Sequence, residues 1–308
     1  MQLVAVDLGG TRIKTGIIDA GVIIADSIIN AAPEKGLAAH LPIIKEQISS
    51  LLDKTKISGI TAIAMAFPGL VDTVQNKVID TSGKYEDAPL VHLTEWAQQE
   101  LGMRLKLEND ARMACLGEWK WGAGKGSSDM VMFTLGTGIG SSVIMNGKIV
   151  RGKHFQAGVL GGHFIIDYTK DAPRCTCGNF GCAESIASTW RLKDAATKHS
   201  LFNKSALREA AKTDYAAVSH FAAKGDALAI ELQEVCLQAW SAALINLIHS
   251  YDPEVVVIGG GIMHSKDIII PYFKKTIKER AWCPWGMPEI KPALYPDTAA
   301  LLGGALLF

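Results

Sequence analysis

The amino-acid sequence predicts an α/β protein of two domains, each of which begins with an antiparallel β-unit. The first observation is length, because 308 residues exceed what one hydrophobic core usually supports. The second is an internal repeat. The third is the alternation of apolar, strand-like runs with helical stretches along the rest of the chain.

The repeat lies at an offset of 127 residues, which is the difference between positions 131 and 4. Residues 4–23 (VAVDLGGTRIKTGIIDAGVI) align with residues 131–150 (VMFTLGTGIGSSVIMNGKIV). In both segments an apolar run meets a Gly/Thr-rich turn, and two further apolar runs follow, separated by a short turn. Any two β-hairpins share part of this pattern, but here the register holds through two turns. We therefore predict a duplicated β-unit, with one copy in each domain.

Strand-like and helical runs alternate through the rest of the chain. We expect a smaller α/β domain at residues 1–121 with a C-terminal helix at 297–308, and a larger α/β domain at residues 122–296. The expected elements are a helix at 36–53, a buried strand in ITAIAMAFPG (60–69), a strand in RLKLEND (104–110), a helix at 111–121, four helical stretches between 189 and 250, and a buried strand in EVVVIGGGI (254–262).

Composition excludes several classes of function. The 31 basic and 31 acidic side chains give a formal net charge of zero, whereas binding to nucleic-acid phosphates needs a basic surface. No uninterrupted apolar run approaches the length that spans a bilayer, and the N-terminal MQLVAVDLGG lacks a secretory signal pattern. The six cysteines show no disulfide framework. We therefore expect a cytoplasmic protein that binds neither nucleic acid nor membrane.

Two Gly/Thr-rich turns occupy the same place in the two repeats. The first turn contains Gly9, Gly10 and Thr11, and the second contains Gly136, Thr137 and Gly138. Consecutive backbone N–H groups in such turns form a concavity suited to phosphate oxygens, and glycine lets the main chain approach a ligand closely. The matched pair predicts a nucleotide held between the domains, with one loop from each.

Three further features flank these turns. Asp7 ends the first strand, and we expect it either to hold a metal-bound water or to cap the turn. Lys14 lies just past the first turn and is a candidate for meeting phosphate charge. The glycines Gly259, Gly260 and Gly261 follow a buried strand, where an adenine ring or a helix N-terminus could pack closely.

A cysteine and histidine cluster predicts a metal site. Cys175, Cys177 and Cys182 have the spacing CxCxxxxC, and His163 lies 12 positions before the first of them. Four such ligands close a tetrahedral zinc site and leave no position for water, so the metal would be structural. The alternative is a set of small buried thiols. With zinc bound, the loop would fix Glu184, two residues after the last cysteine, as a sugar-binding carboxylate.

Asn109 and Asp110 lie where a strand ends and a helix begins. Both residue types are favoured helix N-caps, so capping alone is one interpretation. The functional interpretation is that Asp110 acts as a general base and accepts a proton from a substrate hydroxyl that attacks a phosphoryl group. The carboxyl ends of strands line the ligand crevice of α/β domains, which favours this second interpretation.

Taken in order, the segments DLGGTRIK, FPGLVD, LENDAR, TLGTGIGSS and CTCGNFGCAESIAS resemble the ROK family of sugar kinases and repressors. The family has the two-domain actin-like ATPase (ribonuclease H-like) fold with an interdomain cleft, and the chain is most similar to its zinc-containing glucokinase and N-acetylmannosamine kinase branch. The resemblance implies ATP-dependent phosphorylation of a hexose or N-acyl-hexosamine, with catalytic Mg²⁺ and structural Zn²⁺. It also implies a homodimer or homotetramer. The turns at 9–11 and 136–138 match the family's phosphate loops, and Gly259 to Gly261 match its adenosine side.

The resemblance also assigns roles to single residues. Asp110 matches the catalytic base, and Asn109 matches a ligand of a sugar hydroxyl. Gly69 matches a glycine of the sugar loop. Glu184 and His163 match the sugar-contacting and zinc-linked residues.

Two segments depart from the family pattern. Leu160 occupies the position of a glutamate that contacts the sugar in the pattern GExGH, and a sugar hydroxyl left unpaired against leucine costs about 1–3 kcal/mol. The stretch TSGKYED at 81–87 replaces an asparagine-containing stretch. The residues that match the family's phosphate loops are thus present, whereas two segments that match its sugar-binding surface differ.

These departures leave alternatives open. The acceptor could be a ketose, a deoxy sugar or an anhydro sugar, which lacks the group that the glutamate would meet. The protein could be a sugar-binding regulatory protein without catalysis, although the intact Asp7, Asn109 and Asp110 oppose this. An actin-like or chaperone-type ATPase is disfavoured by the zinc block. The sequence does not distinguish ATP from polyphosphate as the donor.

Overall fold

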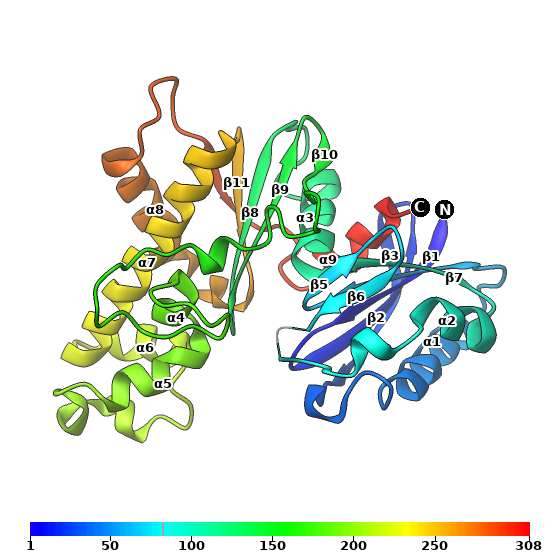
Figure 1. Ribbon diagram of the computed structural model, residues 1–308, viewed down its shortest axis with the longest axis horizontal. Coiled ribbons are helices and arrows are strands. Elements are labelled where there is room, and N and C mark those ends of the chain that lie inside the picture. Colours follow the sequence, from blue (N-terminus) through cyan, green and yellow to red (C-terminus); the bar gives the residue numbers. More distant parts are fainter. Residues whose placement is uncertain (82) are drawn as a thin grey trace. The chain divides into compact units, whose positions relative to one another are not determined.

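The computed structural model describes residues 1–81 and 83–308, which form two compact units (Figure 1). The first unit comprises Met1–Gly126, Ile149–Ala157 and Asp297–Phe308. The second unit comprises Ser127–Lys148 and Gly158–Pro296. Each unit has its own five-stranded sheet.

The first unit is built on a mixed sheet. Across the sheet, its strands are β3 (Val22–Asn30), β2 (Arg12–Asp19), β1 (Gln2–Leu8), β4 (Ala62–Phe67) and β7 (Arg104–Asn109). β1 and β3 are both antiparallel to β2, whereas β1, β4 and β7 run parallel to one another. The carboxyl ends of these three parallel strands therefore meet at one edge of the sheet, where α/β proteins bind their ligands.

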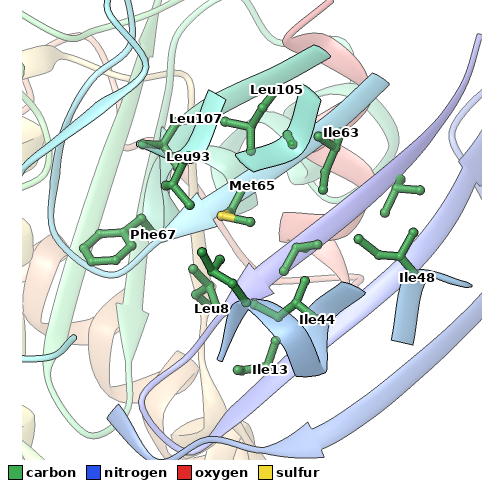
Figure 2. Close-up of a cluster of buried hydrophobic side chains, with 14 of the residues drawn as sticks. Leu8, Ile13, Ile44, Ile48, Ile63, Met65, Phe67, Leu93, Leu105 and Leu107 are labelled. Atoms are coloured by element: carbon green, nitrogen blue, oxygen red, sulfur yellow. The ribbon is translucent and has the colours of Figure 1, made fainter. Parts of the chain in front are cut away.

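Helices cover both faces of this sheet. They are α1 (Leu41–Thr55), α2 (Leu93–Leu101), α3 (Asp110–Trp121) and α9 (Ala299–Gly303), and a small hairpin of β5 (Leu70–Asp72) and β6 (Lys77–Asp80) follows β4. One buried cluster packs the sheet against α1 and α2 (Figure 2). A second cluster packs the opposite face against α3 and α9. Side chains alternate between faces along a strand, so one apolar run supplies both clusters.

The face toward α3 and α9 is lined by small side chains. Ala62, Ala64 and Ala66 of β4 all point into the second cluster, and they let the helices approach the sheet closely. Glycines do the same between the two helices, because a Cβ on Gly117 would strike the carbonyl of Ala299. The C-terminal segment therefore packs as an integral part of the first unit, against the helix that begins at Asp110.

A buried arginine holds residues 149–157 in the first unit. Arg112 on α3 is fully buried and donates hydrogen bonds to the carbonyls of Val150, Phe155 and Ala157, at 2.9–3.1 Å. Its guanidinium also lies 3.6 Å from the buried carboxylate of Glu108. Burial lowers the pKa of Arg112, and the charge of Glu108 opposes this shift. One side chain thus donates hydrogen bonds to three backbone carbonyls and lies beside a buried carboxylate.

The second unit repeats the order of strands. Across its sheet these are β10 (Lys148–Ile149), β9 (Ile139–Met145), β8 (Met130–Leu135), β11 (Val255–Gly259) and β12 (Glu289–Pro292). Its α-helices are α4 (Ala183–Ala187), α5 (Thr189–Thr197), α6 (Tyr215–Ala222), α7 (Ala227–Tyr251) and α8 (Lys266–Arg280). β8 is antiparallel to β9 and parallel to β11, as β1 is to β2 and β4. The duplicated β-unit predicted from the repeat is therefore present.

The long helix α7 is the core helix of the second unit. It is long and apolar enough to cross a membrane by length and composition, but 56% of its most apolar 18-residue window is buried within the fold. Trp240 is fully buried at its centre and donates a hydrogen bond from Nε1 to the carbonyl of Ala187, at 3.0 Å. This burial explains the apolar composition without a bilayer.

Some expected helix boundaries were wrong. The helix expected at 36–53 begins only at Leu41, because Gly36 has a φ of 82° and the Asp87 carboxylate binds the N–H groups of Leu37 and Ala38. In place of four helical stretches between 189 and 250, the structure has the α-helices α5, α6 and α7, with two short 3₁₀ turns between α5 and α6. Aspartates cap the last two helices, so local hydrogen bonds set these boundaries.

The substitution Arg112→Met is expected to destabilise the first unit by about 3–5 kcal/mol, because it removes one partner of a buried ion pair and strands three carbonyls. Urea unfolding monitored by circular dichroism measures this. Lys106→Met, which removes an exposed cation from the neighbouring strand, is the control and should change stability by less than about 0.5 kcal/mol. Equal stability of the two variants would show that the hydrogen bonds and ion pair of Arg112 do not stabilise the first unit.

Candidate active site

In the first unit, the candidate residues gather at the carboxyl ends of the parallel strands. Asp7 of β1 pairs in register with Ala66 of β4, and Phe67 of β4 pairs with Asn109 of β7. Asp7 is the second-to-last residue of β1 and Asn109 is the last residue of β7, so both lie at the carboxyl ends of strands that are separated only by β4. Asp110 follows at once as the first residue of α3. The sheet thus brings together residues that lie about one hundred positions apart in the chain.

Asn109 both caps α3 and positions its neighbour. Its Oδ1 accepts a hydrogen bond from the N–H of Arg112 at 3.1 Å, which is the capping geometry. Its Nδ2 donates to the carbonyl of Gly69 and to Oδ1 of Asp110, both at 3.0 Å. The capping interpretation is therefore correct for Asn109. The same bonds bring Gly69, Asn109 and Asp110 into one cluster.

The carboxylates of Asp7 and Asp110 are only partly exposed, and burial is the largest influence on the pKa of each. Burial raises the pKa of Asp7 to about 6, while the Lys14 ammonium lowers it and the charge of Asp110 raises it further. Burial also raises the pKa of Asp110, opposed by the Lys84 ammonium and by the Ala111 N–H, which donates at 2.8 Å. The nearby ammonium groups thus do not fully offset the effect of burial on these two carboxylates. Raised carboxylate pKa values of this kind are typical of functional sites.

The first Gly/Thr turn joins β1 to β2. The N–H of Gly9 donates to the carbonyl of Arg12 at 2.9 Å and closes the turn, which leaves Thr11 exposed. The Lys14 ammonium contacts the C-terminal segment. Its Nζ donates to the carbonyl of Asp297, and its ammonium lies 3.7 Å from that residue's carboxylate, so it ties β2 to the C-terminal segment.

Lys84 and Tyr85 are site residues that the sequence analysis missed. Tyr85 is buried and donates a hydrogen bond from its hydroxyl to the carbonyl of Gly9, at 2.9 Å. The Lys84 side chain lies over Gly10, where a Cβ would come within 3.1 Å of its Cε and 3.4 Å of its Nζ. Both belong to the stretch at 81–87 noted for its departure from the family, in which Ser82 lies outside the described residues.

In the second unit, the matching turn lines a pocket. Gly136, Thr137 and Gly261 face a cavity of about 230 Å³, whose other lining residues are Thr189, Lys212, Asp214, Tyr215, Ala216, Ile262, His264 and Ser265. β8 and β11 are parallel and adjacent, so the turns that follow them open on the same edge. Gly260 has a φ of 91°, and a Cβ there would strike the carbonyl of Leu135. The structure thus brings the second Gly/Thr turn and the triple glycine together.

Glu184 lies behind the second turn. Its Oε2 accepts a hydrogen bond from the N–H of Ile139 at 3.1 Å, and a Cβ on Gly138 or Gly162 would come within 3.1 Å of the same oxygen. Glycine at both positions leaves room for the carboxylate. Leu160, two residues before Gly162, is 37% exposed and forms no part of the core.

The predicted metal ligands converge. The Sγ atoms of Cys175, Cys177 and Cys182 and a ring nitrogen of His163 all lie within 4.8 Å of one another. The sulfurs of Cys177 and Cys182 are 3.7 Å apart. In a tetrahedral site with Zn–S bonds of about 2.3 Å, two sulfurs are separated by about 3.8 Å, so this donor set fits zinc.

The protein is expected to bind one Zn²⁺ per chain, and the substitution Cys182→Ser should release it and lower the thermal midpoint by about 5 °C or more. Metal analysis and thermal unfolding measure the two effects. Cys283→Ser removes a cysteine outside the cluster and should keep both values unchanged. Zinc-free wild-type protein whose stability does not respond to added Zn²⁺ would show that the cluster is only a group of thiols.

The substitution Asp7→Asn is expected to stabilise the ligand-free protein at pH 8 by about 1–3 kcal/mol. The raised pKa means that the folded state holds the Asp7 proton more tightly than the unfolded state, so wild-type stability falls as pH rises through about 6. The gain should therefore shrink as the pH falls from 8 toward 4. Urea unfolding across this range measures it, and Asp53→Asn, at an exposed position on α1, is the control.

Comparisons with known proteins agree with these features. The ROK family model matches residues 3–308. A glucokinase of Thermotoga maritima is 28% identical over 312 residues, which cover 99% of this chain and 96% of that protein. The Escherichia coli transcriptional repressor Mlc is 23% identical over 91% of this chain and 70% of the repressor.

A solved structure extends the likeness to three dimensions. The crystal structure of a ROK family glucokinase from Streptomyces griseus, in complex with glucose and AMPPNP, has a TM-score of 0.83 and 25% sequence identity. The match covers 100% of this chain and 99% of that one. This confirms the predicted fold class, that of the actin-like ATPases. The chain belongs to the ROK family.

Proposed function

We propose that the protein catalyses ATP-dependent phosphorylation of a hydroxyl group on a hexose or N-acyl-hexosamine, with Asp110 as the general base. The observation that carries the proposal is the cluster of Gly69, Asn109 and Asp110 at the edge of the first sheet, beside the Gly9–Thr11 turn. The family is the second support, because the Thermotoga and Streptomyces relatives are glucokinases.

Asp110 suits the task of a general base. The N–H of Ala111 and the Nδ2 of Asn109 both donate to its Oδ1, which fixes the carboxylate. Oδ2 would then accept the proton of the substrate hydroxyl. The raised pKa brings its proton affinity closer to what proton transfer near neutral pH requires. The base accepts the hydroxyl proton as the oxygen attacks phosphorus.

Two features bear on the binding of ATP and Mg²⁺. The pocket lined by Gly136, Thr137 and Gly261 has a size and a mixed polar lining suited to part of a nucleotide, and the AMPPNP complex of the Streptomyces relative supports ATP as the donor. Asp7 is a partly buried carboxylate whose negative charge the Lys14 ammonium does not fully offset, which fits a residue that holds Mg²⁺ through water. Bound Mg²⁺ would neutralise phosphate charge.

Glu184 and Leu160 bear on the identity of the acceptor. Glu184 offers a carboxylate fixed by the Ile139 N–H and, with zinc bound, by the cysteine loop. Leu160 is exposed beside this loop and cannot accept a hydrogen bond. This favours, as a second candidate, an acceptor that lacks a hydroxyl at the matching position, such as a ketose, a deoxy sugar or an anhydro sugar.

The decisive measurement is ADP release with ATP and Mg²⁺ across aldoses, ketoses, N-acyl-hexosamines and anhydro sugars. We expect at least one acceptor to be phosphorylated. Asp110→Asn should then lower kcat by about 1,000-fold while the zinc content stays unchanged and the thermal midpoint does not fall. Asp53→Asn is the matched control and should leave kcat unchanged.

Turnover retained by Asp110→Asn would remove Asp110 as the base. The kinase proposal would be contradicted if the folded, zinc-loaded protein phosphorylated no acceptor of the panel with either ATP or polyphosphate as the donor. That result would favour a regulatory, sugar-binding role.

A further inference from the structure

Lys84 is the ammonium group that lies over the first Gly/Thr turn. Its side chain packs across Gly10, so closely that a Cβ at that glycine would lie 3.1 Å from Cε and 3.4 Å from Nζ. The other nearby lysine, Lys14, is directed to Asp297. Lys84 therefore supplies positive charge at this turn from a distant part of the chain.

The backbone around Lys84 is held by several contacts. The next residue, Tyr85, has a φ of 54°, a conformation unusual for a non-glycine residue, and its N–H donates to the carbonyl of Pro33 at 3.2 Å. Its hydroxyl binds the carbonyl of Gly9 at 2.9 Å, and the N–H of Lys84 donates to the carbonyl of Thr81 at 3.0 Å. The turn that carries Lys84 is thereby fastened to the turn that Lys84 covers.

The charge of the Lys84 ammonium is not neutralised by an ion pair within 4 Å in the part of the chain that the structure describes. This charge nevertheless acts on Asp110. The ammonium thus lies over the turn at Gly10 and is close enough to the carboxylate at the start of α3 to lower its pKa. An anion that approached Asp110 along this turn would pass the lysine.

We propose that Lys84 is a catalytic residue whose Nζ donates hydrogen bonds to an oxygen of the phosphoryl group during its transfer. The inference rests on the proposed kinase function. In the transfer, the acceptor oxygen forms a bond to the γ-phosphorus, and the bond from that phosphorus to the β–γ bridging oxygen breaks. The acceptor proton passes to Asp110, and ADP leaves. Lys84 keeps its proton throughout and stabilises the charge on the transferring group.

A simpler role for Lys84 would be to tune Asp110 alone. In that case, removal of the ammonium would raise the pKa of Asp110 and shift the pH profile, and activity would return at higher pH. A third role, binding an anionic group of the acceptor, would change KM for acidic sugars only. The phosphoryl role differs from both, because it lowers kcat at every pH and for every acceptor.

The test compares Lys84→Met with Lys84→Arg and with the control Lys77→Met, which removes an exposed lysine of β6 in the same unit. We expect Lys84→Met to lower kcat by about 100-fold or more from pH 6 to pH 9, with KM for ATP and for the acceptor changed by less than about threefold. Lys84→Arg should retain at least about a tenth of kcat, and Lys77→Met should retain all of it. Loss of less than threefold, recovery at high pH, or an effect confined to KM of acidic acceptors would overturn the proposal.

A second readout does not depend on finding the acceptor. Aluminium fluoride with ADP and Mg²⁺ mimics a phosphoryl group in transfer, so the wild-type protein should retain ADP through gel filtration in its presence. Lys84→Met should lose this retention, whereas binding of ADP alone should stay within about threefold of wild type. Equal retention by the two proteins, or no retention by the wild type, would overturn the role of Lys84. Failure of the kinase proposal is distinguishable, because the wild-type protein would then release no ADP with any acceptor of the panel.

Discussion

The candidate site depends on two carboxylates that the fold holds partly away from water without full compensation. Asp7 lies near the carboxyl end of β1, Asp110 directly follows the carboxyl end of β7, and burial raises the pKa of both. Phosphate groups would add further negative charge, so the site can bind a nucleotide only if cations accompany it. This requirement is the reason for proposing a divalent metal ion at Asp7 and a phosphoryl contact for the Lys84 ammonium.

The scaffold around these carboxylates is built for rigidity. Asn109 is committed to three hydrogen bonds, which fix both the start of α3 and the carboxylate of Asp110. One turn further on, Arg112 fastens residues 149–157 to the same helix, and Glu108 is shared between Arg112 and Arg151. Small side chains then allow α9 to lie directly on α3. The helix that begins with the proposed base is therefore held along its length.

The second unit achieves order in a different way. Its loop from Gly161 to Glu184 contains little regular structure, and four metal-ligating side chains converge within it. Glycines at positions 138 and 162 leave space for the Glu184 carboxylate behind the Gly/Thr turn. A bound zinc ion would thus order a loop that hydrogen bonding between regular elements does not secure, and it would place a carboxylate beside the turn.

The sequence by itself determined the features that depend on local pattern. The repeat predicted the duplicated sheets, the cysteine spacing predicted the metal cluster, and the order of motifs predicted the ROK family. Only the tertiary structure decided which lysine covers Gly10. The hydrogen bond from Tyr85 to Gly9, 76 residues apart in the chain, holds the turn that carries Lys84 against the turn that contains Gly10. The tertiary structure also decided that Lys14 binds Asp297 and that Arg112 serves three distant carbonyls. Periodicity and spacing report on neighbours along the chain, whereas these contacts depend on how separate elements pack.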